Sequence, residues 1–259
     1  MNQRVPLTPD AALSHPLLES PPQLCLWRAQ TDHDASTGLD GRFEKSGFFR
    51  LNVERTDIHE ESGATVVERT LRGAFGEAIT HRTRIRVLGT HDYLLDEYVG
   101  LPDGPLDVLR VGVQFSLAAG IDRVDWTGLG PWENYPDRRA SALLGRWSAT
   151  VDELATPYVR PQENGTRGGV DELELRGAAG RVDITAGQPL WMTASRHSTD
   201  ALERTAHWWE LPPSDLTHVT LDVAHRGVGT GALGPDTLRE HRVTEREYAW
   251  QWRLRLQAN

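Results

Sequence analysis

The sequence of 259 residues predicts an all-β protein, a large antiparallel sandwich with one short helix. Three observations predict this fold class. Apolar and polar residues alternate with a period of two in several stretches after about residue 65, which is typical of half-buried strands. Clusters of glycine and proline separate these stretches, as turns between strands require. Helical periodicity is confined to one short segment, which argues against a parallel sheet joined by helices.

The predicted strands follow one another along the chain. Residues 80–87 alternate and carry arginine at positions 82, 84 and 86, which indicates the solvated face of an outer strand. Residues 108–117 are apolar at the odd positions from 109, and residues 248–256 are apolar at the even positions. Shorter apolar alternations occur at 182–184 and 219–223. Each pattern predicts one face of a strand in the core and the other face outside it.

Turns and the helix complete the predicted organisation. Residues 198–208 form the only segment with a helical pattern. Because no repeat or linker divides the chain, we expect one β-sandwich domain over residues 21–259, preceded by a loose proline-rich arm over residues 1–20. The predicted turns are residues 101–105, 128–131, 176–180 and 227–231.

The composition excludes several classes of protein. The formal net charge is −9, which disfavours a general nucleic-acid binder. Cys25 is the only cysteine, so a disulfide scaffold is excluded. The sequence has neither an apolar run long enough for a membrane span nor the features of a signal peptide, so we expect no membrane association and a cytoplasmic location.

Motifs for metals and cofactors are weak. The ten histidines are scattered without ligand spacing, so no zinc site is predicted. Asp32 and Asp34 could bind a hard cation, although a capped turn is the commoner meaning of such a pair. The glycine-rich residues 227–231 lack a P-loop lysine and a following helix, which favours a turn between strands. We therefore expect no metal and no cofactor.

Two loop segments, residues 128–138 and 156–167, combine aromatic, amide, carboxylate and arginine side chains with turn formers. Aromatic rings stack on the C–H faces of sugars while planar polar groups bind pairs of hydroxyls, so these loops predict sugar recognition. The same residues could instead fix the loops by internal hydrogen bonds. The candidate substrate-binding residues here are Glu133, Asn134, Arg138, Gln162, Glu163, Asn164 and Arg167.

Five motifs stand out along the chain, namely residues 26–34 (Leu-Trp-Arg-Ala-Gln-Thr-Asp-His-Asp), 130–138 (Gly-Pro-Trp-Glu-Asn-Tyr-Pro-Asp-Arg), 156–165 (Thr-Pro-Tyr-Val-Arg-Pro-Gln-Glu-Asn-Gly), 195–197 (Ser-Arg-His) and 227–235 (Gly-Val-Gly-Thr-Gly-Ala-Leu-Gly-Pro). Taken together, they resemble the C-terminal domain of family-two β-galactosidases, which also occurs as the separate small chain of two-subunit β-galactosidases. The resemblance covers about residues 21 to 256. It implies a twisted antiparallel supersandwich like that of galactose mutarotase.

The resemblance also implies a division of labour. In that family the two catalytic glutamates lie on a TIM barrel, and nothing in this sequence resembles one. We therefore expect no catalytic residue in this chain. Glu133 and Glu163 are expected to brace their loops, and the chain is expected to be inactive alone. A large β-galactosidase chain is the expected partner, and self-association is the alternative because the proline-rich arm replaces strands usual in the family.

Family domains of this kind complete the active site with a loop after a Thr-Asp-Asn-Asp motif and with an aromatic residue of a late glycine-rich loop. The resemblance therefore adds further candidate substrate-binding residues. The departures are His33 in place of asparagine, Ser36 in place of glycine, Leu233 near the aromatic position and His197 where tyrosine is common. The added candidates are Asp32, His33, Asp34, Ser36, His197 and Leu233.

Two other functions stay open at this point. A free-standing mutarotase-like protein would bind or epimerise a sugar with an acid and a base drawn from His197, His225, Glu133 and Glu163. A structural remnant would only support oligomer contacts, and the departures at His33, Ser36 and Leu233 favour it. The expected ligand of the accessory domain itself is a galactoside or a related sugar.

Overall fold

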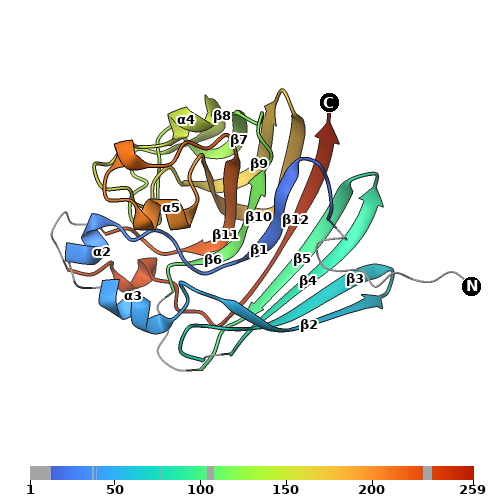
Figure 1. Cartoon of the computed structure of the whole chain (residues 1–259), viewed down its shortest axis with the longest axis horizontal. Coiled ribbons are helices and arrows are strands. Elements are labelled where there is room, and N and C mark those ends of the chain that lie inside the picture. Colours follow the sequence, from blue (N-terminus) through green and yellow to red (C-terminus); the bar gives the residue numbers. More distant parts are fainter. Residues whose placement is uncertain (1–12, 37, 39, 77, 104–107, 230–234) are drawn as a thin grey trace, which may run out of the picture.

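The computed structural model describes residues 13–36, 38, 40–76, 78–103, 108–229 and 235–259, and these residues form a strongly curled antiparallel sheet (Figure 1). The strands along its main path follow the order β1-β6-β11-β10-β12-β5-β4-β3-β2. A further layer is formed by β9, which pairs with β10, by β7, which pairs with β9, and by β8, which pairs with β7. The all-β prediction is confirmed.

The strand bounds follow the chain. The first six strands are β1 (Leu18–Cys25), β2 (Asn52–Glu61), β3 (Ala64–Arg72), β4 (Ala78–Gly89), β5 (Asp92–Gly100) and β6 (Arg110–Leu117). The last six are β7 (Arg123–Gly130), β8 (Leu143–Thr150), β9 (Arg167–Gly177), β10 (Gly180–Ser195), β11 (Thr217–His225) and β12 (Glu247–Ala258).

Strands β6 and β12 show why the period of two predicted the sheet. The apolar positions of both strands are buried except Tyr248, which is half-buried, and the rings of Phe115 and Trp252 stack with their centroids 6.1 Å apart. The alternate side chains, such as Gln114 and Arg253, point away from this core. The alternation of apolar and polar residues thus predicted which side chains of each strand face the core.

The arginine stripe of β4 lies on an outer face, as predicted. Arg82 pairs with Glu61 and Glu68 of the neighbouring hairpin, and Arg86 pairs with Asp96 of β5. These pairs are partly exposed to solvent, where ion pairs contribute little to stability. The stripe therefore lies on a solvated sheet face.

The predicted helix is confirmed at α5 (Thr199–Arg204), where the Ser198 side chain caps the N-terminus, followed by a 3-10 turn η1 (Trp208–Glu210). The structure adds three short helices, α2 (Asp32–Ser36), α3 (Asp40–Ser46) and α4 (Val151–Leu154), and a second 3-10 turn η2 (Arg239–His241). Helix α4 begins with a capping box between Thr150 and Glu153. The Thr-x-x-Glu spacing is a sequence signal for the N-terminus of a helix, and the period-two pattern does not reveal it.

Two predictions about the chain were wrong. Residues 128–130 end strand β7 and are not a turn, because Gly128 and Gly130 allow close approach to Val170 and to the Trp147 ring. Residues 13–20 do not belong to a loose arm, since Leu13 and Leu17 are buried and β1 begins at Leu18. Residues 1–12 of the predicted arm lie outside the described residues. The described helices include none that is long and apolar enough to cross a membrane.

Candidate functional site

Loops from distant parts of the sequence converge on a pocket of about 350 Å³, which we call the loop pocket. Its walls come from helix α2, from the segments after β7 and α4, and from the segment after β11. Six predicted site residues line it, namely Asp32, His33, Glu133, Arg138, Gln162 and Glu163. The remaining lining residues are Thr31, Tyr135, Tyr158, Val228 and Gly229.

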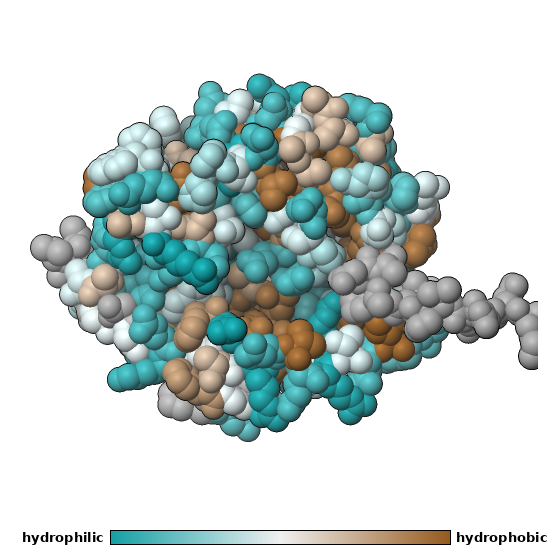
Figure 2. All heavy atoms as spheres, viewed as in Figure 1, coloured by the Kyte–Doolittle hydropathy of each residue, from teal (hydrophilic) through white to brown (hydrophobic). Residues whose placement is uncertain are grey.

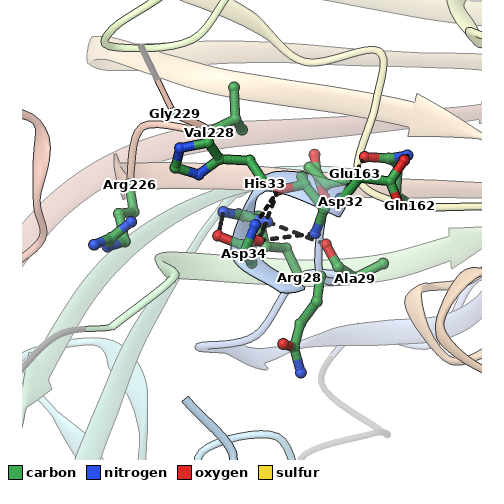
Figure 3. A network of polar contacts seen from close by, with 12 residues as sticks. Arg28, Ala29, Asp32, His33, Asp34, Gln162, Glu163, Arg226, Val228 and Gly229 are labelled. Carbon is green, nitrogen blue, oxygen red and sulfur yellow. Dashed lines mark hydrogen bonds and ion pairs between the residues drawn. The ribbon is translucent and has the colours of Figure 1, made fainter. Parts of the chain in front are cut away.

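The first wall is held by a buried ion pair beneath helix α2 (Figure 3). Arg28 Nη1 donates to Asp34 Oδ2 at 2.7 Å, and the side chains of both residues are fully buried. The Thr31 amide donates to the same carboxylate oxygen at 2.8 Å. Burial alone would raise the pKa of Asp34, but the charge of Arg28 and these hydrogen bonds hold it below its ordinary value. Asp34 therefore caps the turn and does not face the pocket.

Reciprocal hydrogen bonds join the first wall to the loop after α4. The Asp32 amide donates to Gln162 Oε1 at 3.0 Å, and Gln162 Nε2 donates to Asp32 Oδ2 at 2.9 Å. Asp32 nevertheless keeps an exposed carboxylate at the rim. The pair positions an amide and a carboxylate, the groups that bind sugar hydroxyls, on one edge of the loop pocket.

Glu133 is braced by donors from the loop after α4 and from its own loop. Its Oε1 accepts from Arg138 Nη2 at 2.7 Å and from the Tyr158 hydroxyl at 2.8 Å, and its Oε2 accepts from the Gly165 amide at 2.8 Å. Three strong donors satisfy most of the carboxylate. Glu133 thus ties the two sequence motifs together, as the bracing hypothesis predicted.

Glu163 is held in place by Arg110 of strand β6 and by Thr166. Arg110 Nη2 donates to its Oε2 at 2.5 Å, and the Thr166 hydroxyl donates to its Oε1 at 2.8 Å. His225 Nε2 lies 3.9 Å from the same Oε1, but its Nδ1 is 2.7 Å from the Arg226 carbonyl. Burial, with the nearby charge of Arg110, holds the pKa of His225 well below its ordinary value. A neutral imidazole held in this way supports the loop and is not exposed to a substrate.

The glycine-rich segment after β11 forms the far wall. The Asp137 carboxylate accepts from the Val228 amide at 3.0 Å and from the Gly229 amide at 2.8 Å. The His33 side chain lies beside Val228 and Gly229 (Figure 3). Gly229 has a φ of +107°, and a Cβ there would collide with the His33 ring. Glycine is required here for both reasons.

Several predicted site residues lie outside the loop pocket. Asn134 is fully buried, with its amide bonded to Trp132 and Gly168, and the Arg167 guanidinium bonds backbone carbonyls. The Ser36 hydroxyl donates to the His33 carbonyl. Asn164 and His197 line a different cavity, and Leu233 lies outside the described residues. Among the described residues, no three His, Cys, Asp or Glu side chains are grouped to hold a metal ion.

Sequence reasoning missed several residues of this site. Tyr135 and Tyr158 lie within the predicted motifs, and their aromatic character was a usable signal. Asp137 also lies within a predicted motif, although its contact with the segment after β11 was not predicted. Arg110 carries no local signal, because it meets Glu163 through a contact between residues far apart in the chain.

A family model described as "Beta galactosidase small chain" matches residues 10–254. The chain belongs to this family. The match extends over the strands and over all loops of the loop pocket. The predicted resemblance is therefore confirmed.

The relatives of this chain are much longer proteins. A β-galactosidase of Vibrio cholerae is 33% identical over 94% of this chain, and one of Oenococcus oeni is 36% identical over 86% of it. The chain spans 25% and 22% of those proteins, respectively. Among solved structures, a putative aldose 1-epimerase of Escherichia coli K12 superposes with a TM-score of 0.39 and 7% identity, covering 79% of this chain and 69% of that one.

Proposed function

We propose that this chain is an accessory unit of a β-galactosidase that shapes the galactoside site of a barrel chain without supplying the catalytic carboxylates. The observation that carries the proposal is the convergence of six predicted site residues from loops far apart in the sequence on one pocket of about 350 Å³. A pocket of this size, lined by tyrosines, amides and carboxylates, suits a sugar.

The hydrogen bonds of the two glutamates support a non-catalytic role. A retaining glycosidase needs one free carboxylate as nucleophile and another as acid/base. Glu133 accepts three hydrogen bonds of 2.8 Å or less, and Glu163 is committed to Arg110 and Thr166. Carboxylates held in this way fix loops, so the contribution to catalysis is positioning and exclusion of water.

The size of the relatives supports a large partner. The β-galactosidases that this chain resembles carry at least three quarters of their length beyond the matched region. We propose that a barrel-bearing chain supplies that part. The loop pocket would then form one wall of the composite site, with Asp32 and Arg138 as candidate contacts to the galactoside.

The test is reconstitution with a barrel-bearing large chain from the same organism. The purified chain alone should not hydrolyse o-nitrophenyl β-galactoside, and mixing the two chains should restore turnover. Asp32→Ala should then lower kcat/KM by about tenfold or more, because small errors of positioning are costly.

The matched control is Glu60→Ala on the exposed outer strand β2, which should leave the kinetics unchanged. Hydrolysis by the lone chain would contradict the proposal. Equal kinetics for Asp32→Ala and the unchanged chain would also contradict it, and would favour a structural remnant.

A further inference from the structure

A second polar surface lies on the opposite face of the strands that form the core. The register of four neighbouring strands aligns Gln23 of β1 with Gln114 of β6, Gln114 with Thr220 of β11, and Thr220 with Thr193 of β10. The side chains of paired residues lie on the same face of a sheet. A row of two amides and two hydroxyls thus crosses the sheet.

A second row lies beside the first, two residues away on β6, β10 and β11 and three residues away on β1, where the register shifts. Ser20 aligns with Ser116, Ser116 with His218, and His218 with Ser195. The Ser116 hydroxyl and His218 Nδ1 are 2.8 Å apart. The two rows together place hydroxyl, amide and imidazole groups on one surface.

The two rows form the floor of a cavity. All eight row residues line a space of about 190 Å³, roofed by the start of α5 and by His197. His197 Nδ1 is buried and makes no hydrogen bond to any residue that the structure describes. A buried nitrogen of this kind is costly unless a ligand or water satisfies it.

The charges in this cavity are compensated internally. Arg110 and Glu163 also line it, but they pair with each other at 2.5 Å, and Arg110 lies 3.7 Å from Asp222. The Arg110–Glu163 pair carries no net charge, and Asp222 does not line the cavity. The remaining groups suit a neutral molecule with several hydroxyls.

A larger cavity of about 460 Å³ adjoins the first, and the two share Gln23, Gln114, Ser198 and Thr199. Aromatic and aliphatic side chains line much of it, together with Arg69, His81 and Asp200. We call the combined space the sheet-face groove. Trp27 and Phe49 pack edge to face in its larger half, with ring centroids 5.8 Å apart. The space-filling view shows this side of the molecule hollowed near its centre, with hydrophobic residues in the depression (Figure 2). The larger half therefore adds aromatic and aliphatic side chains to the polar rows of the smaller half.

We propose that the sheet-face groove binds a glycoside with an apolar aglycone, the sugar over the two polar rows and the aglycone against Trp27 and Phe49. This site is separate from the loop pocket. Of the described residues that line the loop pocket, only Glu163 also lines the groove. The site would hold a second glycoside molecule and would not take part in the composite active site.

The experiment measures binding of methyl and octyl β-glycosides of galactose and glucose to the full chain by calorimetry, with the octyl compounds below their micellar concentration. The octyl glycosides should bind about tenfold or more tightly than the methyl glycosides, because the aglycone buries apolar surface. Gln114→Ala should weaken both kinds of ligand. Phe49→Ser should weaken the octyl ligands selectively.

Both variants change exposed side chains, so the fold should be retained, and circular dichroism checks this. Asp32→Ala in the loop pocket is the matched control and should leave octyl glycoside binding unchanged. The proposal is overturned if neither ligand binds, if Gln114→Ala binds both normally, or if Asp32→Ala abolishes binding instead. None of these results bears on reconstitution with a barrel chain, so the two proposals fail separately.

Discussion

Arg110 Nη2 donates to Oε2 of Glu163 at 2.5 Å, and this buried ion pair separates the loop pocket from the sheet-face groove. Glu163 lines both spaces, whereas Arg110 lies on the side of the groove. The pair therefore connects strand β6, one of the four strands crossed by the polar rows, to the loop after α4, which carries predicted sugar contacts.

Arg110→Met should destabilise the fold strongly. The change leaves the carboxylates of Glu163 and Asp222 without their cation in a buried setting, which costs about 3–5 kcal/mol for broken buried pairs. Urea unfolding followed by tryptophan fluorescence measures the loss. Arg82→Met, which breaks partly exposed pairs on β4, is the control and should cost about 0–1 kcal/mol. Equal losses would show that the buried pair has no special role.

Gly229→Ala should destabilise the wall of the loop pocket. A side chain at a φ of +107° is strained, and its Cβ would displace the His33 ring, so we expect about 1–3 kcal/mol lower stability. Gly41→Ala is the control, because a Cβ there meets nothing within 4 Å. Thermal unfolding of both variants makes the comparison. A Gly229→Ala protein as stable as Gly41→Ala would mean that the wall adapts freely.

Cys25 should resist alkylation in the native protein. Its thiol is buried and donates to the Trp27 carbonyl at 3.1 Å, and burial raises its pKa to about 11. Because the thiolate is the reactive form, iodoacetamide at pH 8 should label the chain only after urea is added. Ser141→Cys in a Cys25→Ala background provides an exposed thiol that should react without urea. Rapid native labelling of Cys25 would indicate that β1 opens readily.

The faces of the strands could be predicted from the sequence more completely than the contacts of the site residues. The faces of β6 and β12 followed from alternation, because burial acts on every second side chain. The bracing of Glu133 and Glu163 could be anticipated only in kind. Arg138 was a candidate because it shares a motif with Glu133, whereas Arg110 was not distinguishable from other arginines. The Arg110–Glu163 pair joins strand β6 to the loop after α4, and a local sequence pattern does not predict a contact between such distant segments.

Glycine shows the same limit of local patterns. Gly128 predicts a turn by composition, but it serves a close approach of β7 to Val170, which depends on the partner strand. Leu13 and Leu17 lacked a periodic pattern, and their burial depends on the curled sheet that they help to close.

Asp222→Asn should change how stability depends on pH. Burial raises the pKa of Asp222 to about 7 from its ordinary value of 3.8, although Arg110 opposes the shift. Between these two values the native chain binds more protons than the unfolded chain, so this residue lowers stability as pH rises from about 4 to 7. Asp222→Asn removes that contribution, and its free energy of unfolding should rise relative to the unchanged protein across this window.

Urea unfolding at several pH values from 4 to 8 measures the difference between the two proteins. His225, whose pKa is lowered by burial, makes stability rise with pH in both proteins, so its effect cancels largely in the difference. Above pH 7 the difference should level off, because Asp222 is then ionised in both states. A difference that stays constant from pH 4 to 8 would mean that Asp222 is already ionised in the fold at pH 4, with Arg110 outweighing its burial.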